Sequence, residues 1–283
     1  MPGLPPIIRK PAAKVWRERI RPWTRRFDGK PDFLIIGAQK AGTTWLTFLL
    51  TQQASMLKPK VKEVHYFNKF YDLGGRWYRS NFATSADAAE RARETGVPRQ
   101  LRYEATPDYL FDTEVPARIA ADLPGVRLVV LVRDPVWRAV SAYRHMIRHG
   151  LETRSLEDAI LGEEAHLEQA WKTSPAAGRQ ALEYHSYVAR GRYFEQIERY
   201  RRLFPAQDIH VMVYEDFVAD PQAALVELSR FLDAPMVMPQ RTDAQNVGDY
   251  ERQIEPHIER HIRRATEADT ISLFEMLNRP RPW

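Results

Sequence analysis

The chain lacks several features that would place it in a specialised class of protein. Its 283 residues include no cysteine, which excludes disulfide bonds and thiolate metal sites. No apolar run reaches the roughly 20 residues that a membrane-spanning helix needs, and the N-terminus has no apolar stretch typical of a secretory signal. We therefore expect no transmembrane segment, with the cytoplasm as the default location. The 44% hydrophobic and 28% charged residues instead favour one large domain with a packed core.

Positive charge is concentrated at one end of the chain. Residues 1–30 hold nine Lys or Arg residues against Glu18 and Asp28, so they carry +7, while the whole chain carries only +5. We predict a basic N-terminal arm over residues 1–30. The arm can make weak contact with an anionic lipid surface, or it can pack Trp16 and Trp23 on the body of the protein. No nucleic-acid-binding motif follows, so we expect no nucleic-acid partner.

A strand, a glycine loop and a helix start follow one another directly after this arm. The apolar run Phe33–Ile36 ends at Gly37, a second glycine is Gly42, and Thr43 and Thr44 open an amphipathic run. Such a loop turns successive backbone N–H groups inward, and the helix N-terminus adds partial positive charge. The pattern predicts a site for a phosphate or sulfate group.

The glycine spacing is that of nucleotide triphosphatases, but the residues around it are not. Those enzymes need Gly-Lys-Ser/Thr, with the lysine for the terminal phosphates and the hydroxyl for magnesium. Here Thr43 occupies the lysine position, and Lys40 lies earlier, inside the loop. Taken alone, the loop is either an anion site of another kind or a glycine turn with an exposed lysine.

A second anion-binding pattern follows the run Arg127–Val132, whose β-branched residues are typical of a strand buried on both faces of a parallel sheet. The next residue, Arg133, can bind a phosphate oxygen, and Ser141 lies about two helical turns further on with a hydroxyl for the same anion. Asp134 before Pro135 is interpreted as a helix N-cap. For each residue alone, an ion-paired arginine or a packed serine is the alternative.

Strands and helices alternate along the remaining chain, which predicts an α/β fold with a parallel β-sheet flanked by helices and ligands at the carboxyl ends of the strands. The predicted strands are residues 32–36, 101–104, 127–132 and 209–214. The predicted helices are residues 43–53, 85–95, 115–122, 135–149, 155–161 and 221–232, with a long helical pattern over 181–203 that is interrupted at Gly191 and two helical segments at the end.

Both anion motifs resemble those of the sulfotransferases that use 3′-phosphoadenosine 5′-phosphosulfate (PAPS) as donor. The run Gln39-Lys-Ala-Gly-Thr-Thr-Trp is similar to their 5′-phosphosulfate loop, and Arg133-Asp-Pro-x-x-Arg-Ala-x-Ser-x-Tyr is similar to their 3′-phosphate motif. The resemblance implies a single-domain, P-loop-like sulfotransferase fold over residues 31–283. It implies donor contacts by Lys40, Ala41, Gly42, Thr43, Thr44, Trp45, Arg133, Ser141 and, from a further family landmark, Tyr193. For Trp45, stacking on adenine and packing in the core are both open.

A third motif, Lys62-Glu-Val-His-Tyr-Phe, is similar to one in the heparan sulfate 3-O-sulfotransferases and their relatives, including N-sulfotransferases. The resemblance implies that Glu63 is the base that takes the acceptor proton, with His65 as the second candidate, while Lys40 neutralises the departing bridging oxygen. Without it, Glu63 would be a surface carboxylate paired with Lys60 or Lys62, and His65 a structural histidine. The implied acceptor contacts are Lys62, Glu63, His65, Tyr66, Phe67 and Tyr109.

The predicted function is sulfuryl transfer from PAPS to a hydroxyl, or alternatively an amine, of a carbohydrate or small natural product. Ala105 stands where the heparan-directed enzymes usually have a lysine, which argues against a heparan-like acceptor. No metal is expected, because the histidine pairs His145/His149 and His257/His261 lack a third ligand in the usual zinc patterns. The alternatives are a nucleotide-dependent kinase of related fold and a non-catalytic nucleotide-binding scaffold.

Overall fold

The structure is a computed structural model that describes residues 27–242 and 254–283. The described residues form two compact units. We call residues 27–132 and 196–242 the sheet unit, and residues 133–195 and 254–283 the helical unit. Residues 1–26, which make up most of the predicted basic arm, lie outside the described part of the chain.

The sheet unit is built on a five-stranded parallel sheet with the strand order β2-β3-β1-β4-β5. Its strands are β1 Phe33–Gly37, β2 Met56–Leu57, β3 Leu101–Ala105, β4 Arg127–Val132 and β5 Ile209–Val213. The central strand β1 pairs through Ile35 with Ala105 on one side and with Val129 on the other. The carboxyl ends of β1 and β4 therefore lie together at one edge of the sheet, where ligands bind in parallel α/β folds.

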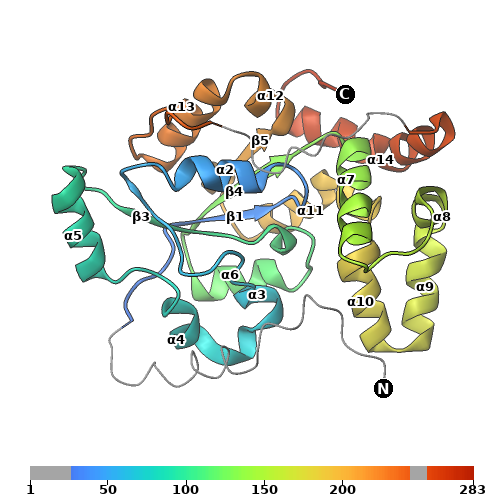
Figure 1. Cartoon of the computed structure of the whole chain (residues 1–283), viewed down its shortest axis with the longest axis horizontal. Helices are drawn as coiled ribbons and strands as arrows, with labels where there is room; N and C mark the ends of the chain where they lie inside the picture. The colour runs from blue at the N-terminus through green and yellow to red at the C-terminus, as the bar shows by residue number, and fades with distance from the viewer. Residues whose placement is uncertain (1–26, 243–253) are drawn as a thin grey trace. The chain divides into compact units, whose positions relative to one another are not determined.

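Helices cover both faces of this sheet. Figure 1 shows α2, α12 and α13 on one face and α3, α4 and α6 on the other. The helices of this unit are α2 Thr43–Leu50, α3 Tyr66–Lys69, α4 Gly74–Arg79, α5 Ser85–Thr95, α6 Val115–Asp122, α12 Tyr214–Ala219 and α13 Pro221–Leu232. Short 3-10 turns are η3 Tyr71–Leu73, η4 Pro107–Tyr109 and η6 Ala206–Asp208. The predicted α/β architecture is confirmed.

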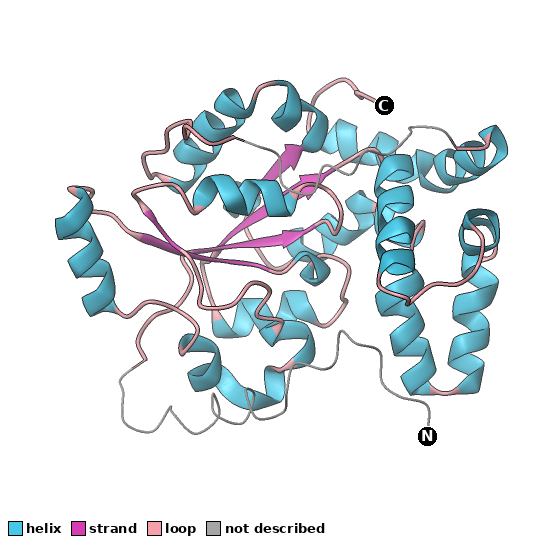
Figure 2. Cartoon of the chain, in the orientation of Figure 1, coloured by secondary structure: helices cyan, strands magenta, loops and turns pink. Residues whose placement is uncertain are grey.

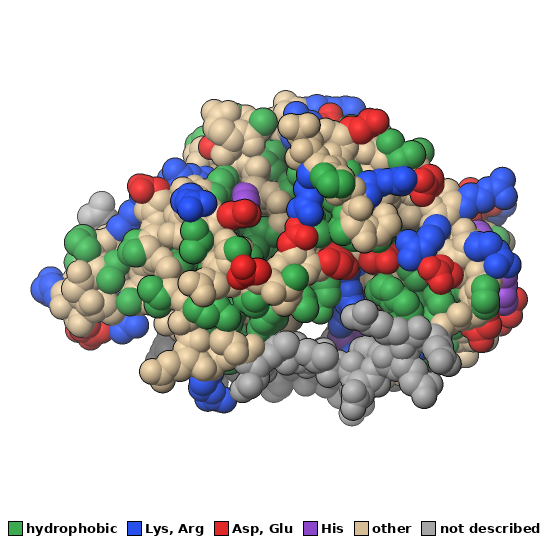
Figure 3. All heavy atoms as spheres, turned by 90° about the horizontal axis from the view of Figure 1, so that it is seen from above, with side chains coloured by type: hydrophobic (Ala, Val, Ile, Leu, Met, Phe, Trp, Pro, Cys, Tyr) green, Lys and Arg blue, Asp and Glu red, His purple; other side chains and the backbone are tan. Residues whose placement is uncertain are grey.

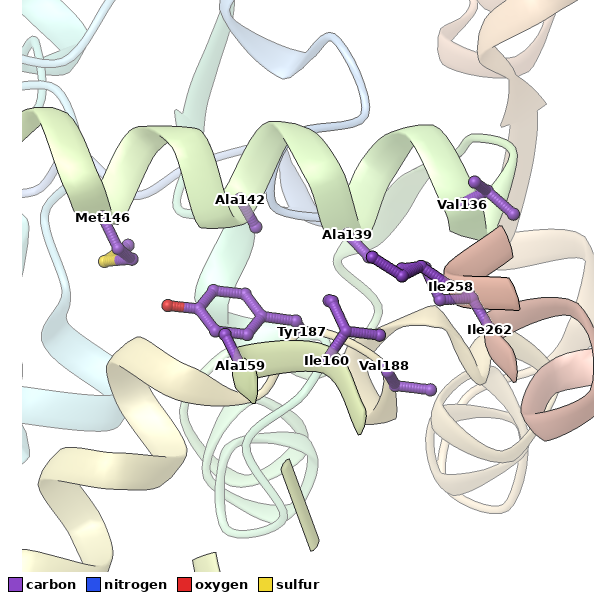
Figure 4. Packing of buried hydrophobic residues seen from close by; sticks show 10 residues of the cluster. All are labelled: Val136, Ala139, Ala142, Met146, Ala159, Ile160, Tyr187, Val188, Ile258 and Ile262. Atoms are coloured by element: carbon purple, nitrogen blue, oxygen red, sulfur yellow. The ribbon is translucent and has the colours of Figure 1, made fainter. Parts of the chain in front are cut away.

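The helical unit packs around a hydrophobic cluster beneath α7. Its elements are α7 Pro135–Arg148, α8 Leu156–Leu161, α9 Glu163–Thr173, α10 Pro175–His185, η5 Ala189–Gly191 and α14 Pro256–Met276, and α11 Tyr193–Arg201 continues into the sheet unit. Figure 2 shows that α9 and α10 form a helical hairpin. In Figure 4, Val136, Ala139 and Ala142 of α7 face Ile160 and Ile262 from other helices. Apolar side chains on one face of α7 thus connect the segments of this unit.

Local start signals predicted the helix beginnings correctly. Asp134 caps α7, since its carboxylate accepts a hydrogen bond of 2.8 Å from the backbone N–H of Val136, and Pro135 is the first helical residue. Asp220 caps α13 in the same way through Ala223. Both caps are determined within a few residues, so they are readable from the sequence.

The helical patterns are confirmed in part. The predicted interruption at Gly191 is present, because the pattern over residues 181–203 is divided among α10, η5 and α11, although α10 already begins at Pro175. The chain closes with one described helix, α14, where two segments were expected. The break between α10 and α11 brings Gly191 against Pro135, where an added Cβ would lie 3.1 Å from the proline Cβ. Strand β2 was not predicted, because a strand of two residues carries no periodic signal.

Charged side chains of both signs lie on the surface of the described residues. No helix among residues 27–242 and 254–283 combines the length and apolar character needed to cross a membrane. On the face drawn in Figure 3, basic and acidic side chains are interspersed. This mixture agrees with a net positive charge that is concentrated in residues 1–30.

Candidate active site

The glycine loop joins β1 to α2 and is shaped by close backbone packing. The N–H of Ala38 donates to the carbonyl of Leu131 in β4, with a distance of 2.7 Å. Gly42 has φ 97°, and a Cβ there would lie only 2.6 Å from the ring of Tyr214. Glycine is therefore required at this position both by the left-handed backbone and by the close contact. Lys40 also has a positive φ, 69°, which is unusual for a residue with a side chain.

The end of the loop is the N-terminus of α2, and its polar groups suit an anion. Gly42 is the N-cap, and no side chain caps this end of the helix. The N–H groups of a first helical turn have no acceptor within the helix, and they carry the positive end of its dipole. Thr43 and Thr44 add hydroxyl groups at this end. The local geometry fits the predicted site for a phosphate or sulfate group.

Trp45, predicted to contact the donor, is largely packed inside the sheet unit. Its side chain is 7% exposed, and its ring centroid lies 4.3 Å from that of Phe217. Its indole Nε1 donates to the carbonyl of Thr242 over 3.1 Å. These contacts are those of a core tryptophan, and stacking on adenine stays a prediction.

Lys62, predicted to face the acceptor, reaches the glycine loop. Its Nζ donates to the Oγ1 of Thr44, and the distance is 2.8 Å. Desolvation of the ammonium group lowers the pKa of Lys62, an effect that the nearby Glu63 carboxylate opposes. The contact brings together the predicted acceptor motif and the predicted donor loop through two residues that are 18 positions apart in the chain.

Glu63 and His65 form a hydrogen-bonded pair beside this lysine. The Oε2 of Glu63 lies 3.2 Å from the Nε2 of His65, and the other ring nitrogen, Nδ1, lies 3.3 Å from the Oδ1 of Asn68. Glu63 has φ 22° and His65 has φ 54°. Backbone strain of this kind persists only where the surrounding structure enforces it, and it is concentrated at functional sites. The partner of Glu63 is thus His65, where the sequence alone favoured Lys60 or Lys62.

Asp108 joins this pair, and the sequence analysis did not select it. The ligand atoms of Glu63, His65 and Asp108 all lie within 4.8 Å of one another. Such a set could hold a cation. However, a side-chain oxygen of Asp108 accepts from Gln39 over 3.4 Å, and Glu63 and His65 lie within hydrogen-bonding distance of each other. The expectation that no metal binds here stays a prediction.

Glu104, which directly precedes Ala105, is a second residue that was not among the predicted site residues. Its side chain is 1% exposed and accepts hydrogen bonds from Thr106 (2.8 Å), Tyr109 (2.6 Å) and Tyr78. Burial raises the pKa of Glu104, and these donors oppose the increase. Because Thr106 also accepts from the backbone N–H of His65 over 3.5 Å, the buried carboxylate supports the loop that carries the candidate base.

The aromatic residues predicted to bind the acceptor lie below that loop. Tyr66, Phe67 and Tyr109 are 2%, 0% and 0% exposed. Tyr66 stacks on Tyr78 at a centroid distance of 4.5 Å, and Phe67 meets Tyr109 edge-on at 5.5 Å. All three residues therefore pack in the core of the sheet unit, and direct contact with an acceptor stays a prediction for them.

The second anion motif belongs to the helical unit. Arg133 is partly buried, and its backbone carbonyl accepts a hydrogen bond of 2.8 Å from the hydroxyl of Tyr193. Tyr193 is fully buried. Ser141, also partly buried, is on α7. Tyr193 therefore holds the backbone of Arg133, a role that the sequence did not show.

The residue patterns and this geometry agree with the comparison to known families, in which the family model "Sulfotransferase domain" matches residues 30–267. The chain belongs to the sulfotransferase family. The match runs through both compact units as one domain. The predictions of a sulfotransferase fold and of a sulfotransferase are confirmed.

Curated relatives of this sulfotransferase are longer than the chain. The membrane-associated sulfotransferase kil1 of Dictyostelium discoideum is 24% identical over 89% of this chain and 66% of its own length. Human heparan sulfate glucosamine 3-O-sulfotransferase 6 is 30% identical over 77% of this chain and 55% of its own length. This chain therefore spans about half to two thirds of these relatives.

A solved structure supports the fold assignment. The sulfotransferase from Alicyclobacillus acidocaldarius has a TM-score of 0.67 and 25% identity, and the match covers 89% of this chain and 98% of that one. The likeness thus extends over nearly all of that structure.

Proposed function

We propose that this protein transfers the sulfuryl group of PAPS to a hydroxyl, or alternatively an amine, of a carbohydrate or small natural product. The observation that carries the proposal is the 2.8 Å hydrogen bond from Lys62 to Thr44, next to the Glu63–His65 pair. This bond supports a position of the candidate base beside the candidate donor loop. Proximity of this kind, with cations around the transferred group, is what an in-line transfer needs.

Donor binding would use both anion motifs, and the family generally uses PAPS as its donor. The backbone amides of Ala41 and Gly42 and the start of α2, with Thr43 and Thr44, would bind the 5′ phosphate. Lys40 would neutralise the bridging oxygen as the bond from sulfur to phosphate oxygen breaks. In the helical unit, Arg133 and Ser141 would bind the 3′ phosphate.

The acceptor proton would pass to Glu63 as the new bond to sulfur forms. His65 lies on the other side of this carboxylate and can share the proton, because its Nε2 faces Glu63 while Nδ1 faces Asn68. Lys62 would stabilise negative charge on the transferred group. Its lowered pKa fits a group that is drawn out of water by the loop. Tyr66, Phe67 and Tyr109 would support this loop by packing beneath it.

The acceptor is proposed to be less acidic than heparan sulfate. Ala105 ends β3 and is 3% exposed, so this position supplies no cation where the heparan-directed enzymes usually have a lysine. Lys62 remains as a cation beside the base. A neutral sugar or a small natural product fits this reduced positive charge better than a polysulfated glycan.

Transfer of radiolabelled sulfate from PAPS to a panel of neutral glycans, sulfated glycans, lipids and phenols tests the proposal. We expect transfer to at least one neutral acceptor and none to heparan sulfate. Tight binding of adenosine 3′,5′-bisphosphate without transfer to any acceptor would instead favour a scaffold. Magnesium-dependent ATP binding that outcompetes PAPS would favour a kinase.

The location and surface contacts of the protein stay predictions. Residues 1–30 carry the excess positive charge, and a relative is named as membrane-associated. Flotation of the full chain with vesicles of neutral and of anionic lipid tests whether residues 1–30 bind a charged surface. Binding that is equal for both kinds of vesicle would contradict the electrostatic contact.

A further inference from the structure

The helical unit contains several charged side chains that are almost completely buried and that the proposed mechanism does not use, among them Arg138, Glu163 and Arg190. Arg138 is 0% exposed, and Glu163 and Arg190 are each 6% exposed. Burial of charge is costly unless geometry and hydrogen bonds compensate for it. We therefore expect these residues to hold another part of the helical unit in place.

Arg138 and Glu163 hold the same short segment from two helices. Arg138 of α7 donates from Nη2 to the carbonyl of Tyr187. Glu163 at the start of α9 accepts from the backbone N–H groups of Val188 (2.5 Å) and Ala189 (2.9 Å). Three consecutive residues of the chain thus have backbone groups bound to buried charges.

This segment leads directly to Tyr193. Gly191 packs against Pro135 so closely that a Cβ would lie 3.1 Å from the proline Cβ. Just after Tyr193, the backbone N–H groups of Phe194 and Glu195 donate to the carboxylate of Asp269, over 2.9 and 3.0 Å. Tyr193 is therefore fixed on both sides, and its hydroxyl donates to the carbonyl of Arg133.

The pKa of Arg138 is influenced by the other buried groups around it. Burial lowers the pKa of Arg138 to about 10, Tyr193 and Glu163 oppose this change, and Arg190 and Arg133 add to it. The Nε and Nη1 atoms of Arg138 have no hydrogen-bond partner among the described residues. Through-space interactions therefore act on this charge beside its hydrogen bond to Tyr187, and Glu163 is the carboxylate among the groups that raise the pKa.

We infer that Arg138, Glu163 and Tyr193 are positioning residues that fix the backbone of Arg133 and thereby set the affinity for the 3′ phosphate of the donor. The contacts run from Arg138 and Glu163 to residues 187–189, and through Tyr193 to Arg133. The inference rests on the proposed function, in which Arg133 binds that phosphate. It assigns a role to Arg138 and Glu163, which are not among the predicted donor contacts, and a role to the hydroxyl of Tyr193 besides the predicted donor contact.

The test compares two nucleotides that differ only in the 3′ phosphate. Calorimetry measures the Kd of adenosine 3′,5′-bisphosphate and of adenosine 5′-monophosphate for the full chain and its variants. Tyr193→Phe should weaken bisphosphate binding about fivefold, as expected for one lost hydrogen bond, and change monophosphate binding less than about twofold. Glu163→Gln should weaken bisphosphate binding about tenfold or more, because it leaves the charge of Arg138 unbalanced.

Tyr143→Phe is the matched control. The hydroxyl of Tyr143, also on α7, donates to a backbone carbonyl over the same 2.8 Å, but the acceptor is Arg154. This variant should leave both Kd values unchanged. If Glu163→Gln does not fold, as shown by circular dichroism, Tyr193→Phe decides, because it removes one oxygen and keeps the buried ring.

Arg133→Ala distinguishes a failure of the positioning role from a failure of the proposed donor site. If this variant loses the preference for the bisphosphate while Tyr193→Phe and Glu163→Gln keep it, the positioning role is wrong and the donor assignment stands. If Arg133→Ala keeps the full preference, the assignment of Arg133 to the 3′ phosphate is wrong. Equal weakening of both nucleotides by Tyr193→Phe also overturns the inference, because it indicates a general structural effect.

Discussion

The two anion motifs of this sulfotransferase are built in different ways. In the sheet unit, the glycine loop is shaped by its backbone, through the left-handed Gly42 and Lys40 and the N-terminus of α2. In the helical unit, the backbone of Arg133 is held by a side chain, Tyr193, which follows a segment bound to buried charges. The loop should therefore be sensitive to added volume, and the Arg133 motif should be sensitive to the removal of charge or of single hydrogen bonds.

The largest expected effects come from removing the cation of each motif. Lys40→Ala and Arg133→Ala should both nearly abolish transfer, by about 10³-fold in kcat/KM, because each removes a charge that is proposed to face the donor. Lys40→Ala should act mainly on kcat and Arg133→Ala mainly on the KM for PAPS, as measured by steady-state transfer of labelled sulfate. The exposed Lys58→Ala serves as the control. If both variants changed kcat and KM in the same way, the proposed division of roles between Lys40 and Arg133 would be wrong.

Glu63→Gln should have the next largest effect. It keeps the shape of the side chain but removes the base, so kcat should fall by about 100-fold while the Kd for adenosine 3′,5′-bisphosphate stays close to that of the unmodified protein. Glu90→Gln, an exposed change on α5, should alter neither value. Normal turnover in Glu63→Gln would move the role of base to His65.

Substitution of two glycines in the sheet unit distinguishes the cost of backbone strain from the cost of a close contact. Gly42 and Gly96 have positive φ values, 97° and 68°, but a Cβ at Gly42 would meet Tyr214 at 2.6 Å, while one at Gly96 would meet nothing within 4 Å. Gly96→Ala should lower the free energy of unfolding by about 1 kcal/mol, and Gly42→Ala by about 2–4 kcal/mol. Urea unfolding measures both. Equal losses would mean that Tyr214 moves aside without cost.

A further effect appears only at acidic pH and concerns a histidine of the sheet unit. Burial lowers the pKa of His210 on β5 to about 4, and its ring stacks on Phe231. The unfolded chain therefore binds more protons than the folded protein between about pH 6.5 and pH 4, so stability should fall as the pH falls through this window. His210→Leu should reduce this loss by on the order of 1–2 kcal/mol.

Unfolding in urea at pH 7 and pH 4.5 measures the contribution of His210. The exposed His261→Leu on α14 is the control and should leave the pH dependence as it is. If His210→Leu unfolds with the same pH dependence as the unmodified protein, the acid sensitivity arises elsewhere in the chain.

Features set by neighbours in the chain could be predicted from the sequence. The glycine loop, the caps at Asp134 and Asp220 and the buried strand β4 each depend on a few consecutive residues. Helices α5 and α6 have the predicted bounds. The resemblance to sulfotransferases was readable for the same reason, because its motifs are short runs of residues.

Only the tertiary structure decided which distant groups meet. It joined Lys62 to Thr44, buried Glu104 beneath the loop of His65, and placed Arg138 and Glu163 around one segment of backbone. The sequence does not show whether a glutamate or an arginine is buried or exposed, because the packing of the folded chain decides this. Short-range hydrogen bonds and backbone preferences are encoded locally, whereas desolvation and long-range contacts arise only when the whole chain has folded.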